Sequence, residues 1–116
     1  MQYLLLIYDT EKTFETMPQD QLGAFMGAYN AFSAEVAASG HLVNANRLHD
    51  VDRATTVRIR EGKQQITDGP FAETREQLGG YYLINAKNLD EATAIAARIP
   101  SAKTGSIEIR PIREME

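Results

Sequence analysis

Hydrophobic and polar residues recur with clear periods along most of the chain. In residues 1–8 (MQYLLLIY), apolar side chains occur at both odd and even positions, which point to opposite faces of a strand. This pattern is typical of a central strand that is covered on two faces. The segments "ATTVRIR" at 54–60 and "QQIT" at 64–67 flank a short "EGK" turn and predict an antiparallel hairpin. The full set of predicted strands is 1–8, 42–48, 54–60, 64–67, 81–86 and 106–112.

A long amphipathic helix is predicted over residues 18–39. Pro18 suits a first helical turn, where its missing N–H costs nothing, and Gly40 is placed to end the helix in a left-handed conformation. Between them, apolar side chains recur at helical spacing: Leu22, Phe25, Met26, Tyr29, Phe32 and Val36.

A second helix is predicted to follow Asn88. Asn88 is an N-cap residue, and Glu91 stands three positions later as a capping-box partner. Pro100 ends this helix, whereas the polar stretch 9–17 before the first helix predicts a turn.

The order of these elements predicts an α+β fold within a single domain, residues 1–116. Without the hairpin, the order is that of a ferredoxin-like β-α-β-β-α-β arrangement, with two helices on one face of an antiparallel sheet. The other face is apolar at its centre, because the strand at 1–8 is apolar on both sides. Since a monomer rarely exposes such a face, we expect a two-fold homodimer packed sheet to sheet.

Composition narrows the classes of protein that fit. The chain has no cysteine, which excludes disulfides, thiol nucleophiles and cysteine metal sites and fits a cytoplasmic protein. Its formal net charge of −4 provides no electrostatic footprint for nucleic acid. The longest apolar run, at 3–8, is too short to span a bilayer. We therefore expect direct contact with neither nucleic acid nor a membrane.

Residues 68–80 read "DGPFAETREQLGG" and interrupt the strand pattern. Together with the flanking strands, and with "MQYLLLIY" and "LDEATAIAARIPSAKTGSIEIRPI", this motif resembles the DGPF family of YCII-related domain proteins over essentially the whole chain. One departure is Arg75, where the family often has lysine. The resemblance implies a dimeric α+β barrel and a link to transcription regulators such as extracytoplasmic-function sigma factors. Barrels of this kind include lactone isomerases, dehydrochlorinases and metal-independent monooxygenases, a likeness of fold only.

Two interpretations of Asp68 stay open. In the first, Asp68 caps a rigid Asx-type turn in which Pro70 fixes the backbone and Phe71 is a buried anchor. In the second, Asp68 is a general base at a strand end, desolvated by its surroundings. Its pocket, lying between the sheet and the 68–80 loop, would then contain side chains that bind the ligand and stabilise developing negative charge: Tyr8, Arg58, Phe71 and Tyr82.

Other polar clusters give weaker signals. Glu73 and Glu76 could share one face of a helical turn, although a solvated surface explains them equally simply. His49 with Asp50 and Asp52 has too few ligands at metal-binding spacing. We therefore predict no metal and no cofactor.

These features leave the enzymatic status open. The first hypothesis is a small-molecule-binding protein that, if active, is a cofactor-free lyase or isomerase with Asp68 as its base. The alternative is a non-catalytic sensor or accessory module that acts with a regulatory protein partner such as a sigma factor. A third, compatible role is that the 68–80 loop crosses to the second subunit, with Phe71 as its anchor.

Overall fold

The computed structural model describes residues 1–114 and contains a four-stranded antiparallel sheet with the order β2-β5-β1-β6. This is the strand order of a ferredoxin-like fold, so the predicted α+β class is confirmed. The sheet consists of β1 (Gln2–Asp9), β2 (Leu42–Arg47), β5 (Gln77–Asn85) and β6 (Ser106–Pro111). A separate two-stranded sheet consists of β3 (Thr55–Arg60) and β4 (Lys63–Asp68).

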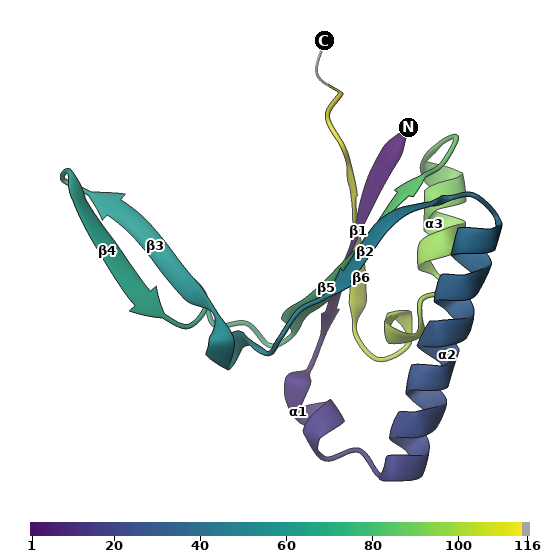
Figure 1. Ribbon diagram of the computed structural model, residues 1–116, viewed down its shortest axis with the longest axis horizontal. Coiled ribbons are helices and arrows are strands. Elements are labelled where there is room, and N and C mark those ends of the chain that lie inside the picture. The colour runs from purple at the N-terminus through teal and green to yellow at the C-terminus, as the bar shows by residue number, and fades with distance from the viewer. Residues whose placement is uncertain (115–116) are drawn as a thin grey trace.

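Two helices cover one face of the four-stranded sheet (Figure 1). They are α2 (Gln19–Ala38) and α3 (Leu89–Ala96), and single 3-10 turns occur at η1 (Val51–Arg53) and η2 (Pro100–Ala102). In the described part of the chain, no helix has both the length and the apolar character needed to cross a membrane.

A short helix, α1 (Glu11–Glu15), occupies part of the stretch for which the sequence predicts only a turn. Its N-cap residue, Thr10, makes no capping bond with its side chain. Phe14 instead packs on Phe25 of α2, with ring centroids 5.2 Å apart. Tertiary packing therefore favours this helix, because its local sequence supplies little helical signal.

Alternation along β1 separates the two faces of the sheet. Tyr3, Leu5 and Ile7 point toward the helices and are buried. They join a core with Tyr82 and Ile84 of β5 and with residues of both helices. The opposite face has no covering element in residues 1–114. We call it the open sheet face, and its half-buried apolar side chains are Leu4, Leu6, Tyr8, Leu78, Tyr81 and Leu83.

The residues predicted to end α2 and to cap α3 do so, except that the Glu91 side chain bonds to the N–H of Lys87 and not to that of Asn88. Gly40 has φ 82°, and Asn88 Oδ1 accepts a bond from the Glu91 N–H at 3.0 Å. Glu91 Oε1, however, accepts from the Lys87 N–H and contacts His41 Nε2 at 3.1 Å. Desolvation opposes the charge of Glu91, but these hydrogen bonds prevail and lower its pKa. Glu91 thus ties the start of α3 to the end of α2.

The double glycine lies inside β5 rather than at its entrance. Residues 72–76 form bends and irregular backbone, without a helical turn, and the strand begins at Gln77. Gly79 is the extra residue of a bulge between the pairs Ile7–Gly80 and Tyr8–Leu78. A Cβ at Gly80 would lie 2.8 Å from the Asn46 carbonyl oxygen. Gly80 therefore permits the close approach of the β2 backbone, whereas a Cβ at Gly79 would meet no atom within 4 Å.

The hairpin formed by β3 and β4, residues 55–68, is called the arm. It projects away from the body on the side of the sheet opposite the helices (Figure 1). Its turn residues Glu61 and Gly62 both have positive φ, 54° and 76°, as a type I′ turn requires. The arm explains a radius of gyration of 16.3 Å, when a compact chain of this length has about 13 Å.

Candidate ligand-binding site

A cavity of about 330 Å³ lies between α2 and the sheet, within the range of roughly 300–1,000 Å³ common for small-molecule sites. Residues 22–33 of α2 and the helix α1 form one wall, and β1, β2 and β5 form the other. On the helical wall, the ring of Phe25 packs against the ring of Phe14 on one side and against that of Tyr29 on the other. The apolar lining consists mainly of Ile7, Phe14, Leu22, Phe25 and Met26.

Two pairs of hydroxyl groups interrupt this apolar lining. The Tyr29 hydroxyl donates to Ser101 Oγ at 2.6 Å, and Ser33 Oγ lies 2.6 Å from the Tyr82 hydroxyl. Tyr29 and Ser33 are one helical turn apart, so both face the cavity. Burial raises the pKa of Tyr29, although its hydrogen bond with Ser101 acts in the opposite direction. The phenol therefore stays a neutral donor.

Asp9 is the buried carboxylate of the cavity wall. Its oxygens accept from the Thr10 N–H at 2.8 Å and from the Thr104 hydroxyl at 2.6 Å. Gly105 allows the chain to pass beside it, since a Cβ there would lie 2.0 Å from the Tyr8 carbonyl oxygen and 2.9 Å from Asp9 Cγ. Asp9 thus fastens the loop before β6 to the end of β1.

Glu11 is a second carboxyl group that lines the cavity. Its Oε2 accepts from the Val51 N–H at 3.0 Å, which joins α1 to the turn preceding the arm. Burial raises the pKa of Glu11, the bond from Val51 opposes this, and the nearby Asp50 and Asp52 charges add to the rise. A carboxylate with increased proton affinity beside an apolar cavity has the properties of a proton acceptor.

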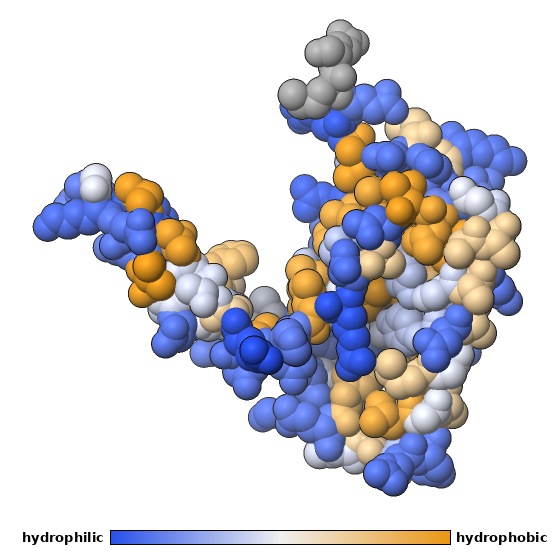
Figure 2. Space-filling model, viewed as in Figure 1, coloured by the Kyte–Doolittle hydropathy of each residue, from blue (hydrophilic) through white to orange (hydrophobic). Residues whose placement is uncertain are grey.

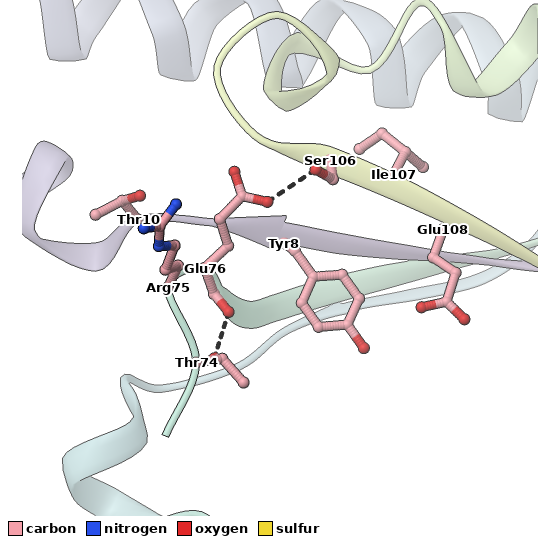
Figure 3. Close-up of a pocket in the computed structure, with 8 residues that line it drawn as sticks. All are labelled: Tyr8, Thr10, Thr74, Arg75, Glu76, Ser106, Ile107 and Glu108. Carbon is pink, nitrogen blue, oxygen red and sulfur yellow. Dashed lines mark hydrogen bonds between the residues drawn. The ribbon is translucent and has the colours of Figure 1, made fainter. Parts of the chain in front are cut away.

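A second, shallower hollow lies on the open sheet face (Figure 3). Its volume is about 710 Å³, and many of its lining side chains are exposed to solvent. Glu76 Oε1 accepts a hydrogen bond from the Ser106 hydroxyl at 2.8 Å (Figure 3). We call this hollow the open concavity, and its lining consists of Tyr8, Thr10, Thr74, Arg75, Glu76, Ser106, Ile107 and Glu108.

The five residues of the predicted pocket do not meet within one chain. Tyr82 faces the helices and lines the cavity, whereas Tyr8 faces the other side of the sheet and lines the open concavity. Arg58 and Asp68 are exposed on the arm, and Phe71, just beyond it, is 78% exposed. A common pocket for these residues stays a prediction.

The turn at the base of the arm is stabilised differently from the predicted Asx turn. No hydrogen bond joins the Asp68 side chain to residues 1–114. Instead the Gly69 N–H donates to the Ala54 carbonyl at 2.7 Å, and the Thr56 hydroxyl donates to the Gly69 carbonyl at 2.8 Å. Phe71 is likewise no buried anchor in the described chain, because no element of the body reaches it.

Sequence reasoning missed several residues of the cavity. Tyr29 and Ser33 had a visible signal, since two hydroxyl residues four apart lie on an apolar helical stripe. Glu11 had none, because its segment was predicted to be a turn and its partner Val51 lies 40 residues away. Within residues 1–114, no group of three or more histidine or acidic side chains is arranged to hold a metal ion.

The model of the YCII-related domain matches residues 1–116 of this chain. The chain belongs to the YCII-related domain family. An uncharacterised protein of Rhizobium meliloti (strain 1021) is 36% identical over 114 residues, which are 97% of this chain and 92% of that protein. The resemblance of the "DGPFAETREQLGG" motif and its flanks to YCII-related proteins is thereby confirmed.

A solved structure shares the fold of this YCII-related chain. It is 5-chloro-2-hydroxyhydroquinone dehydrochlorinase (TftG) from Burkholderia phenoliruptrix AC1100, in complex with 2,5-dihydroxybenzoquinone. The similarity covers 99% of this chain and 96% of the other, with a TM-score of 0.57 and 12% sequence identity. At that identity the likeness concerns the arrangement of helices and strands.

Proposed function

We propose that this YCII-related protein binds a small hydroxylated ring compound in the cavity between α2 and the sheet. The observation that carries the proposal is the pairing of an apolar lining with two inward-facing hydroxyl pairs, Tyr29–Ser101 and Ser33–Tyr82. Apolar walls favour a ring, and a few fixed polar groups orient its oxygen atoms. The solved dehydrochlorinase of the same fold holds 2,5-dihydroxybenzoquinone, a compound of this class.

Proton transfer is the chemistry that the cavity supports best. The carboxylate of Glu11 lines the cavity and has a raised pKa, so it is suited to accept a proton from a ligand hydroxyl or an acidic C–H. The neutral Tyr29 hydroxyl is suited to donate a hydrogen bond to the oxygen on which negative charge develops. A cofactor-free lyase or isomerase needs these two roles.

Asp68 remains the alternative base. In a single chain its carboxylate is exposed on the arm, away from the lining of the cavity. Asp68 would need a second copy of the chain to supply an enclosed site. Glu11 is therefore the better-supported candidate for the base. Activity assays of variants at Glu11 and at Asp68 distinguish the two candidates.

Binding is tested with ¹⁵N-labelled protein titrated with 2,5-dihydroxybenzoquinone, followed by other hydroxylated aromatics and by lactones. We expect chemical-shift changes at the amides of Ser33, Gly79 and Gly80, which line the cavity. Tyr29→Phe should weaken binding about fivefold, since one hydrogen bond to a ligand typically contributes about 1 kcal/mol. Absence of shifts for the whole panel, or shifts confined to residues of the open concavity, would refute the cavity as the site.

Tyr3→Phe is the matched control. Tyr3 is buried and Tyr29 is half-buried, but Tyr3 lies outside the cavity lining, and its hydroxyl reaches only the Met1 sulfur at 3.8 Å. It should leave ligand affinity unchanged. For any compound that is turned over, Glu11→Gln should abolish most activity and Asp68→Asn should preserve it. The reverse result would identify Asp68 as the base.

The exposed arm favours a second candidate function, an accessory role with a protein partner. The arm displays apolar side chains to solvent, which is unusual for a surface element without a partner. A sigma factor or another regulator remains the partner implied by the family resemblance. Co-purification of wild-type protein and an Ile59→Lys variant with such a regulator tests this role, because only the wild type should retain it.

A further inference from the structure

Arg47, the last residue of β2, lies on the side of the sheet that faces the helices. It pairs with Gly80 of β5, and two positions earlier Ala45 pairs with Tyr82, whose side chain is buried beneath the helices. Side chains of paired residues point to the same side of a sheet, and positions two apart share that side. Arg47 accordingly lines the cavity between α2 and the sheet.

The floor of the cavity is open beside Arg47. Gly80 pairs with Arg47 on one side and with Ile7 of β1 on the other, and all three residues line the cavity. Because glycine has no side chain, β5 places nothing between the guanidinium group and the apolar side chain of Ile7. This row of the sheet therefore has a cation at one end, an apolar group at the other and space for a ligand between them.

The guanidinium of Arg47 has no ionic partner within residues 1–114. Three carboxyl groups line the same cavity, those of Asp9, Glu11 and Asp50, and none of them forms an ion pair with Arg47. Asp9 and Glu11 instead accept hydrogen bonds from other parts of the chain. The positive charge of Arg47 is therefore available to a ligand.

The other basic side chains do not supply a second cation to the lining. Among the cavity residues of the described chain, Arg47 is the one lysine or arginine. Arg58, Arg60 and Lys63 belong to the arm, and Figure 2 shows the arm standing clear of the body. Recognition of an anion in this cavity therefore depends on Arg47.

We propose that the ring compound bound in this cavity carries a carboxylate, which the guanidinium of Arg47 holds above Gly80. This inference rests on the binding proposed above and specifies its ligand class as hydroxylated aromatic acids. The planar fork of arginine N–H groups matches the two oxygens of a carboxylate. Asn30 lines the helical wall of the cavity, where its amide can donate a further hydrogen bond. The ring itself then lies toward Ile7 and the apolar lining.

A matched pair of compounds tests the charge directly. 2,5-Dihydroxybenzoate and 2,5-dihydroxybenzamide share the ring and its hydroxyl groups and differ in the charge of one substituent. Titration of ¹⁵N-labelled protein, followed at the amides of Ser33 and Gly80, gives both dissociation constants. We expect wild type to bind the benzoate about tenfold more tightly, since hydrogen bonds between charged groups are the stronger ones. Arg47→Gln should bring the two constants to about the same value, and Arg47→Lys should retain part of the preference.

The matched control is Arg53→Gln, which removes the same charge from η1, outside the cavity lining. This variant should keep the preference for the benzoate. If wild type binds both compounds equally, or binds the benzamide more tightly, the inference is overturned while the cavity remains the binding site. A preference that persists in Arg47→Gln also overturns it. If neither compound shifts the cavity amides, the proposed binding function fails together with the inference.

A charge added to the opposite wall provides the second test. Asn30→Asp keeps the shape of the side chain, places a negative charge on the helical wall, and should weaken benzoate binding about tenfold more than benzamide binding. Asn44→Asp is its control, because Asn44 pairs with Leu83 on the open sheet face and lies outside the lining. Equal effects of the two variants would contradict a carboxylate held between Arg47 and α2. Circular dichroism of each variant confirms that the fold is retained.

Discussion

The four-stranded sheet and the arm consist of the same kind of alternating strand, but only the sheet has an apolar face that is covered. Leu5 and Ile84 are 0% exposed beneath the helices, whereas Ile66 of the arm is 60% exposed. The connections account for the difference. A helix follows β1 and another follows β5, and these helices return to cover the sheet. A two-residue turn joins β3 to β4, so no covering element belongs to the arm. Alternation thus identifies an apolar face without identifying what covers it.

The largest predicted effect compares one isoleucine from each region. Ile84→Ala should lower the free energy of unfolding by about 2–5 kcal/mol, because it leaves a cavity in the core. Ile66→Ala in dilute protein should change it by less than about 0.5 kcal/mol. Urea denaturation measures both. If the arm packs on a second copy, the cost of Ile66→Ala should grow as the protein concentration increases. Equal losses for the two variants in dilute solution would contradict the comparison.

Substitution of one glycine from each region should give smaller losses of stability than Ile84→Ala. Gly105→Ala forces a Cβ against the Tyr8 carbonyl oxygen and Asp9, and should destabilise the body by about 1–3 kcal/mol. Gly62→Ala in the arm meets no neighbouring atom but must keep φ near 76°, at a cost of about 1–2 kcal/mol. We expect that cost to appear as faster amide exchange within residues 55–68 only, with global stability unchanged. Loss of protection in β1 or β5 would show that arm and body fold as one unit.

The sequence predicts the body far better than it predicts the site. Periodicity and caps located the six strands and two longer helices, because each such signal is local. The arm was also located, since Glu61 and Gly62 follow a pattern that requires a tight turn. The short helix α1 was missed because Phe14 is stabilised by Phe25, a contact between segments that the local pattern does not report.

The site depends on contacts of a longer range. Tyr29 meets Ser101 across 72 positions, and Ser33 meets Tyr82 across 49. Neither pair follows from residue spacing. The predicted pocket grouped Tyr8 with Tyr82, although the register places them on opposite faces of the sheet. The pair Leu5–Tyr82 decides this, because Leu5 and Tyr8 point to opposite faces of β1. Which residues of two strands pair with each other is not visible in the alternation of either strand.

The smallest predicted effect concerns the joint between body and arm. Glu11 accepts from the N–H of Val51, the first residue of the 3-10 turn η1 that precedes β3, and its pKa is raised by burial. A carboxyl group with a raised folded-state pKa contributes stability that is complete below its ordinary value of 4.5 and is lost as pH rises through the folded value. Glu11→Gln removes that loss while retaining an oxygen acceptor for Val51. The variant should therefore be slightly more stable than wild type near neutral pH.

The gain from Glu11→Gln should disappear when urea midpoints are measured below pH 4.5, where the wild-type carboxyl group is protonated. Glu73→Gln is the control, since it replaces an exposed carboxylate in the segment between the arm and β5. It should change stability equally little at both pH values. Because the Val51 bond holds the base of the arm, amide exchange at Val51 separates two cases. If protection of the Val51 amide is unchanged in the variant, a neutral side-chain oxygen is sufficient to accept the bond from Val51. If exchange at Val51 is faster, the bond depends on the negative charge of Glu11.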